Sequence, residues 1–300
     1  MHPQPTPDPR LSVVQAYRPL AALVPPDWQA GDVAANGTRL HYHRTGGTRP
    51  PVVLLHGFQE MGLCWLPIMQ ALAPEYDLIA LDARGHGSSA PAAQGMALEQ
   101  LAADMLGALD ELQLAQVVLL GRSMGAATAV QIAATAPTRV RAILLEDPPM
   151  RPMPLPDDAS YAAWFQSYLR LLDSLRAQPH HQRMATALHL LPPSVLWSEA
   201  DYVPYVAAQI QFNPATLTHA TTDPAIFVRW MPQISRVACP LLLMTGNPQR
   251  GGASSAEGIA AVQAAWQHGT HVAFAEAGHL ISRDAPTAYL ATITRYLRQM

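Results

Sequence analysis

A serine framed by two glycines is the feature of this sequence that points most directly to chemistry. The stretch reads Gly121-Arg122-Ser123-Met124-Gly125, and it follows the apolar run 117–120 and precedes the alanine-rich run 126–136. This context predicts a strand, a sharp turn and a helix, with glycines where the turn has no room for a Cβ atom. The hydroxyl would project from the carboxyl end of a strand, beside a helix start. We therefore predict Ser123 as a nucleophile.

A serine hydroxyl is a poor nucleophile at neutral pH, so a base must lie within hydrogen-bond distance and an acid must orient that base. The candidate base is His279, which stands in Ala277-Gly278-His279 after the last predicted strand. The short glycine-containing loop would present the imidazole just before the final helix. The chain order, with the serine early and the histidine late, fits a nucleophile–acid–base series.

Alternating buried strands and amphipathic helices are predicted to position these residues. Asn36-Gly37 lies between two strand-like runs, 32–35 and 39–43, and predicts a β-hairpin because both residues tolerate positive φ. Apolar runs predict further strands at 51–55, 76–81, 116–120, 142–145, 240–244 and 271–274. Helical spacing is found at 62–72, 98–112, 123–136, 255–267 and 285–298. The alternation predicts a mostly parallel sheet covered on both faces, with ligands bound at the carboxyl ends of its strands.

One segment, residues 148–222, interrupts this alternation. It has no good strand, it is rich in Pro, Met and aromatic residues, and it predicts helices at 160–177, 181–191 and 199–211. We interpret it as a helical cap inserted after the sixth strand, which divides the core into 31–147 and 223–300. Residues 1–30 are predicted to be an extension with a short helix over 11–23, which either packs on the body or contacts a partner subunit.

The composition favours a globular intracellular protein. The 300 residues are 49% hydrophobic, which is enough for one large core, and the net charge of −3 comes without a basic cluster for nucleic acid. We find no apolar run long enough to cross a membrane and no secretory signal, so we expect a cytoplasmic location without membrane contact. Cys64 and Cys239 are expected to be reduced thiols.

Neither a cofactor nor a metal is expected. The sequence has no glycine-rich nucleotide motif. His41 and His43 lie on one strand face, but no third ligand is near them in the sequence, so we predict no metal site. The chain is expected to be a monomer or a homodimer. Its expected binding partner is a small-molecule ester or lactone substrate.

Four motifs occur in an order that can be compared with a known family. They are His56-Gly57-Phe58, the stretch 82–87 (Asp-Ala-Arg-Gly-His-Gly), the stretch 121–125 and Gly278-His279. With these motifs the chain resembles the α/β-hydrolase superfamily from about residue 32 to its end. The resemblance implies an α/β-hydrolase fold, which is a mostly parallel eight-stranded sheet flanked by helices, here with an inserted helical cap. It also implies Ser123 as nucleophile and His279 as base.

The third member of the triad departs from the common pattern of the family. Most relatives carry a carboxylate after the seventh strand, but the corresponding loop here has Asn247 and Gln249 and no acid before Glu257. Certain haloalkane dehalogenases and lactone hydrolases carry the acid after the sixth strand, which in this chain is followed by Glu146 and Asp147. We predict Asp147 as the acid, with Glu146 as the alternative.

An oxyanion hole and a substrate pocket complete the predicted site. Two backbone N–H groups, those of Met124 and Phe58, are predicted to hold the developing negative charge. His56 is predicted to brace the loop that carries Phe58. The cap would roof the cleft above the serine, and the residues predicted to bind substrate are Trp164, Met150, Met153 and Trp197.

These features predict a cofactor-independent serine hydrolase that cleaves carboxylic esters or lactones of neutral, fairly apolar substrates through an acyl-enzyme. Two alternatives stay open: a C–C bond hydrolase of the same fold, and a ligand receptor that retains the triad and turns over slowly. Dehalogenase and epoxide hydrolase activities are disfavoured, because both need an aspartate where Ser123 stands.

Overall fold

The computed structural model describes residues 8–93, 95–151, 159–192, 195, 197–216 and 228–300, and only the backbone of residues 159–162, 164 and 165. An eight-stranded sheet runs through the molecule in the order β1-β2-β4-β3-β5-β6-β7-β8. The strands are β1 (Gln29–Ala35), β2 (Thr38–Arg44), β3 (Pro51–Leu55), β4 (Asp77–Leu81), β5 (Val117–Arg122), β6 (Val140–Glu146), β7 (Leu241–Gly246) and β8 (Gly269–Phe274).

The sheet has an antiparallel edge and a parallel body. β1 pairs with β2, and β2 with β4, in antiparallel register, whereas all pairs from β4 to β8 are parallel. The predicted hairpin is present, since Ala35 pairs with Thr38 and the two turn residues have φ values of 49° (Asn36) and 71° (Gly37). The parallel strands therefore end together at one edge, where a site can be assembled from several loops.

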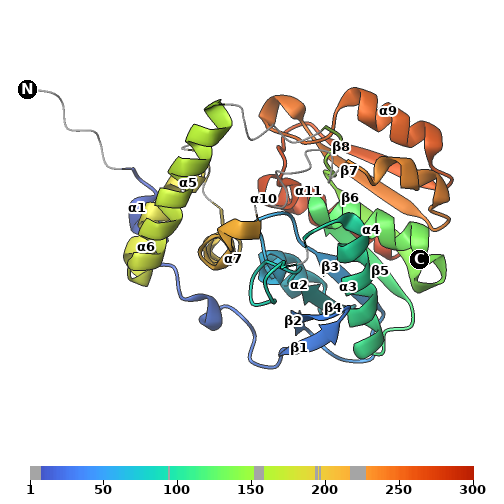
Figure 1. Ribbon diagram of the computed structural model, residues 1–300, viewed down its shortest axis with the longest axis horizontal. Helices are drawn as coiled ribbons and strands as arrows, with labels where there is room; N and C mark the ends of the chain where they lie inside the picture. Colours follow the sequence, from blue (N-terminus) through green and yellow to red (C-terminus); the bar gives the residue numbers. More distant parts are fainter. Residues whose placement is uncertain (1–7, 94, 152–158, 193–194, 196, 217–227) are drawn as a thin grey trace, which may run out of the picture.

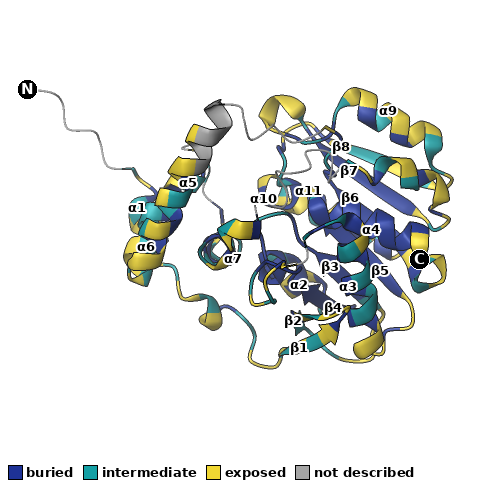
Figure 2. Ribbon diagram, viewed as in Figure 1, coloured by how far each residue is buried: buried dark blue, intermediate teal, exposed yellow. Residues whose placement is uncertain are grey.

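Alternating residues of the central strands pack into two separate apolar clusters, one on each face of the sheet. Val53, Leu119 and Ile143 pack on the face that carries α3 (Leu98–Glu111), α4 (Met124–Thr135) and α9 (Ala256–Ala265). Val52, Leu120 and Leu144 pack on the opposite face, against α2 (Leu66–Leu72) and α11 (Pro286–Leu297). Both faces of the central strands are accordingly buried, as Figure 2 shows, which explains their uninterrupted apolar sequences.

Among the described residues between β6 and β7 are the helices α5 (Ala159–Ala177), α6 (His180–Thr186) and α7 (Glu199–Gln211). In Figure 1, α5 and α6 stand apart from the sheet, and α7 lies between them and the body. The described side chains of this region, among them Tyr168, Leu172 and Tyr202, form an apolar cluster that also includes Leu66 of α2 (Leu66–Leu72). Its division from the core at 148–222 remains a prediction.

The helix expected over 11–23 is shorter in the structure. α1 covers Leu11–Gln15, and a separate 3₁₀ turn covers Leu20–Ala22. Pro19 lies between them, and a proline disfavours helical geometry in the residue before it. The two pieces have different contacts: Val14 packs into the cluster of α5–α7, and Leu20 also reaches Met61 and Leu63 on the body.

Candidate active site

Ser123 sits in a tight turn between β5 and α4. Its backbone adopts φ 53° and ψ −116°, a conformation rare for a residue with a side chain. A Cβ atom on Gly121 would lie 2.4 Å from the carbonyl oxygen of Gly125, and one on Gly125 would lie 2.1 Å from that of Leu55. Both glycines are therefore required by close backbone approach, and the turn leaves Ser123 partly exposed between buried neighbours.

His279 and Asp147 are in direct contact. His279 Nδ1 lies 2.7 Å from Asp147 Oδ2, the imidazole is 33% exposed, and the carboxylate is fully buried. The Gly246 N–H donates to Asp147 Oδ1 at 3.0 Å, and the Ala253 N–H donates to Oδ2 at 2.6 Å. Within the described residues no hydrogen bond joins His279 Nε2 to Ser123 Oγ, and such bonds are often long before substrate binds.

The other residues that could orient the imidazole, Glu146 and Asn247, have hydrogen-bond partners elsewhere. Glu146 Oε1 accepts a hydrogen bond from the Ser282 N–H, and Oε2 lies 3.2 Å from Arg122 Nε. The side chain of Asn247 belongs to its own turn, because Oδ1 accepts from the Gln249 N–H and Nδ2 donates to the Ala275 carbonyl. Of Asp147, Glu146 and Asn247, the structure places Asp147 against the imidazole.

The loop after β3 lies beside the serine. A Cβ atom on Gly57 would lie 3.5 Å from the Cβ of Ser123, so the peptides of this loop border the hydroxyl. Met124, the first residue of α4, is buried, and Phe58 packs against the core with its ring 5.5 Å from that of Phe212. The two amides predicted for the oxyanion hole thus belong to segments that flank Ser123.

His56 links this loop to the next one. Its Nε2 accepts the Ala83 N–H at 2.9 Å, so its Nδ1 carries the proton and donates to the Gly57 carbonyl at 2.7 Å. Burial lowers the pKa of His56, and burial together with His56 lowers the pKa of His86 to about 3. Both rings are neutral supports, which agrees with the bracing role predicted for His56.

A cavity of about 640 Å³ opens beside His279. It is bounded on one side by Leu190, Leu191 and Trp197 of the segment between β6 and β7, and on the other by the loops around Arg250 and Gly278. The cavity has both apolar walls and a charged rim, in keeping with a site for an organic ligand.

The residues predicted to bind substrate have different outcomes. Trp197 lines this cavity, and its ring stacks on Arg283 with the guanidinium carbon 4.8 Å from the ring centre. Met150 is 7% exposed and packs in the main core. It lies against Gly258, where an added Cβ atom would be 2.6 Å from the Cβ of Met150. Met153 and the side chain of Trp164 lie outside the described residues.

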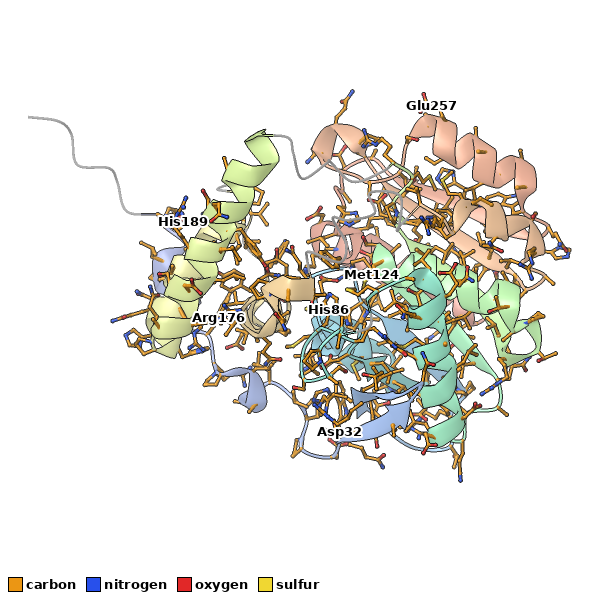
Figure 3. All side chains as sticks on the ribbon, viewed as in Figure 1. Asp32, His86, Met124, Arg176, His189 and Glu257 are labelled. Atoms are coloured by element: carbon orange, nitrogen blue, oxygen red, sulfur yellow. The ribbon has the colours of Figure 1, made fainter. Side chains whose placement is uncertain are left out.

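Sequence reasoning missed the buried charges that surround the site. Glu60, Arg122 and Arg283 are each at most 5% exposed, and both arginines form ion pairs with Glu60. The available signal was their position, because each is a charged residue inside or beside one of the apolar motifs. Figure 3 labels two neighbours of this region, Met124 at the start of α4 and His86.

The described residues contain no group of three His, Cys, Asp or Glu side chains suited to a metal ion. In the same part of the chain, no helix has the length and apolar character needed to cross a membrane.

The family comparison agrees with this fold. The profile described as the alpha/beta hydrolase fold matches residues 50–286, which is most of the chain. The protein therefore belongs to the α/β-hydrolase family, and this membership confirms the fold predicted from the four motifs.

Similar proteins differ in their reactions. One relative is the dihydrolipoyllysine-residue acetyltransferase component of the acetoin cleaving system of Cupriavidus necator. The two chains are 37% identical over 121 residues, and this match covers 40% of this chain and 32% of that protein. Epoxide hydrolases are also among the curated relatives. The chain spans less than half the length of these relatives.

Two solved structures extend the likeness over nearly the whole chain. The N-formylmaleamic acid deformylase of Pseudomonas putida S16 superimposes with a TM-score of 0.73 at 21% identity, covering 88% of this chain and 100% of that one. The enol-lactonase of Burkholderia xenovorans LB400 has a TM-score of 0.66 at 25% identity, covering 89% and 100%. These likenesses support the hydrolase fold over most of the chain.

Proposed function

We propose that this protein is a cofactor-independent serine hydrolase that cleaves carboxylic esters or lactones. The observation that carries the proposal is the buried Asp147 carboxylate, 2.7 Å from His279 Nδ1 and fixed by two backbone amides. A carboxylate in this position orients the imidazole and stabilises its protonated form, which a serine nucleophile requires. The strained turn at Ser123 supplies that nucleophile.

These positions support the following reaction. Ser123 Oγ attacks the carbonyl carbon while His279 Nε2 accepts the hydroxyl proton, and Asp147 stabilises the resulting imidazolium. The N–H groups of Phe58 and Met124 bind the oxyanion of the tetrahedral intermediate. His279 then donates the proton to the leaving oxygen. In the second half of the reaction, water attacks the acyl-enzyme while His279 accepts its proton, and Ser123 Oγ leaves and is reprotonated by His279.

One wall of the cavity beside His279 is apolar and supports a substrate with an apolar group, whereas Arg250 and Glu276 line the opposite side. The leaving oxygen must lie near the imidazole that protonates it, and the cavity offers Leu190, Leu191 and Trp197 to the group attached to that oxygen. The lactone reaction in the name of the Burkholderia enzyme is in keeping with this chemistry. An epoxide hydrolase mechanism has less support, because its nucleophile is a carboxylate and Ser123 provides a hydroxyl.

Hydrolysis of p-nitrophenyl acetate and p-nitrophenyl butyrate tests this proposal, with γ- and δ-lactones assayed in parallel. Turnover that is lost in the Ser123→Ala variant supports it. Folded wild-type protein that turns over none of these substrates would contradict it.

A further inference from the structure

Four charged side chains are buried together behind the candidate active site. Glu60, Arg122, Glu146 and Arg283 are exposed by 4%, 1%, 0% and 5%. Arg122 Nη1 lies 2.9 Å and Arg283 Nη2 lies 2.8 Å from Glu60 Oε1, and Arg122 Nε lies 3.2 Å from Glu146 Oε2. Arg122 also donates to the hydroxyl of Ser282. Buried charges of this kind persist only when they are paired.

Each of these side chains comes from a segment that carries one part of the site. Arg122 immediately precedes the serine, and Glu146 immediately precedes Asp147. Arg283 lies in α10 (Ile281–Asp284), directly after His279, and Glu60 lies in the loop that carries Phe58. The cluster therefore joins all the segments that must be held in a fixed relation.

Glu60 has an additional contact that the other three lack. Its Oε2 accepts the Gly57 N–H at 2.9 Å, and its own N–H donates to the Gly57 carbonyl at 3.1 Å. His56 Nδ1 donates to the same carbonyl at 2.7 Å. Both polar groups of Gly57 are thus held from fixed directions.

This arrangement determines where the next amide points. The Gly57 carbonyl and the Phe58 N–H belong to one planar trans peptide, so the N–H points away from the carbonyl oxygen. With that oxygen held by His56 and the Glu60 amide, the Phe58 N–H is directed to the opposite side of the peptide. Gln59, the following residue, has φ 63°, and its carbonyl accepts from Gln209 Nε2 of α7 at 2.8 Å.

We propose that Glu60, clamped between Arg122 and Arg283, is a positioning residue for the oxyanion hole, and that it acts through the Gly57 peptide to aim the Phe58 N–H at the oxyanion. The assignment rests on the proposed serine hydrolase function. Glu60 touches no reacting atom. Its contribution lies in fixing a donor before the reaction, which is where oxyanion stabilisation gains over water.

The test compares Glu60→Gln with the wild-type enzyme in p-nitrophenyl butyrate hydrolysis. Rates are expressed per active Ser123, titrated with diethyl p-nitrophenyl phosphate. We expect kcat to fall about 10- to 100-fold, less than the roughly 10²–10³-fold for outright loss of an oxyanion donor, with KM changed by less than about 3-fold. Phenylboronic acid, which forms a tetrahedral adduct with the serine, should lose affinity by a similar factor.

A buried ion pair elsewhere gives the matched control. Asp77 is 2% exposed in its side chain, begins β4 at the amino edge of the sheet and pairs with Arg44 at 2.7 Å. Asp77→Asn should lower thermal stability without changing kcat or boronate affinity per active site. If Glu60→Gln behaves like Asp77→Asn in these two measurements, the positioning role is overturned.

A second variant covers the case in which Glu60→Gln does not fold. Arg283→Lys keeps one cation beside Glu60 but weakens the clamp, so kcat and boronate affinity should fall together, by a smaller factor than in Glu60→Gln. Unchanged values in a folded Arg283→Lys protein would overturn the proposal. If the wild-type protein hydrolyses the ester and both variants keep its kcat and boronate affinity, only the role of Glu60 is overturned. If the folded wild-type protein does not hydrolyse the ester, the hydrolase function is overturned and the role of Glu60 with it.

Discussion

Ser123 and Asp147 both have a positive φ, which is uncommon for residues with a side chain, at the ends of neighbouring strands. Their φ values are 53° and 42°, and they directly follow Arg122 and Glu146, which pair in register across β5 and β6. The Ser123 N–H donates to the Glu146 carbonyl at 2.9 Å, so the two turns are joined. Strained conformations of this kind cost about 1–3 kcal/mol each and persist where the surrounding structure holds them.

The role of Asp147 as the residue that orients His279 is tested by comparing two variants, Asp147→Asn and Asn247→Ala. Asp147→Asn removes the negative charge that stabilises the imidazolium, and kcat for ester hydrolysis should fall by about 10³- to 10⁴-fold. Asn247→Ala removes only a turn side chain, so kcat should stay within about 3-fold of wild type. A large loss in Asn247→Ala with little change in Asp147→Asn would reverse the assignment.

Particular residues show why much of the site is readable in the sequence. Gly121, Gly125 and the apolar run before them specify the turn at Ser123, because local backbone contacts alone require them. The sequence favours Asp147 as the acid because the loop after β7 offers no carboxylate. Its contact with His279, 132 positions away, depends on the order of strands in the sheet. Local patterns do not encode that order, and the family resemblance supplied it.

The cluster around Glu60 shows what the sequence does not reveal. Its four charges come from four distant segments, and no spacing rule links them. Likewise, Met150 was expected at the substrate because it follows the sixth strand, but tertiary packing places it against Gly258 in α9. A methionine beside a predicted cleft and one inside the core have the same local sequence signal.

Gly125 should tolerate no side chain. A Cβ there would lie 2.1 Å from the Leu55 carbonyl oxygen, so Gly125→Ala forces α4 away from β3. We expect a loss of more than about 2 kcal/mol in the free energy of unfolding, measured in urea. Gly37→Ala is the control, because Gly37 has φ 71° but no atom within 4 Å of its Cβ position, and it should cost only about 1–2 kcal/mol. Equal losses would contradict the close-approach argument.

Stability in acid should depend on Glu60. Burial alone would raise the pKa of this carboxyl group, but Arg122 and Arg283 lower it from 4.5 to about 2. A lowered pKa in the folded state contributes stability that is present above pH 4.5 and is lost as the pH falls toward 2. The free energy of unfolding of Glu60→Gln should therefore change less than that of wild type between these pH values.

Urea unfolding at intervals of pH would measure this difference. The buried neutral rings of His56 and His86 also destabilise the folded state in acid, but they do so in both proteins. Two curves with the same slope below pH 4.5 would show that Glu60 does not titrate as the structure implies.

The N-terminal segment is expected to hold the helices between β6 and β7. Arg10 is 9% exposed and donates to the carbonyl groups of Pro192 and Val195 at 2.8 and 2.9 Å. Arg10→Ala removes both hydrogen bonds, and because Pro192 is exposed and Val195 is half-buried, the loss should be about 1–3 kcal/mol of unfolding free energy. Because Val195 borders the cavity beside His279, KM should rise more than kcat falls.

Arg18→Ala provides the comparison for Arg10→Ala. Arg18 is 62% exposed in its side chain and pairs with Glu199 at 2.7 Å. An exposed pair contributes about 0–1 kcal/mol, so this variant should be nearly as stable as wild type and have the same KM. The opposite ranking of the two variants would show that the segment is anchored differently.

The most direct test of the central claim is the site of acylation. Wild-type protein mixed with excess p-nitrophenyl acetate, quenched in acid within the first turnover and analysed by peptide mass spectrometry should carry acetyl on the peptide that contains Ser123. A His279→Gln variant treated in the same way should carry almost none. Acetyl on another residue, or turnover without any modification of Ser123 while Ser123→Ala stays active, would contradict the account.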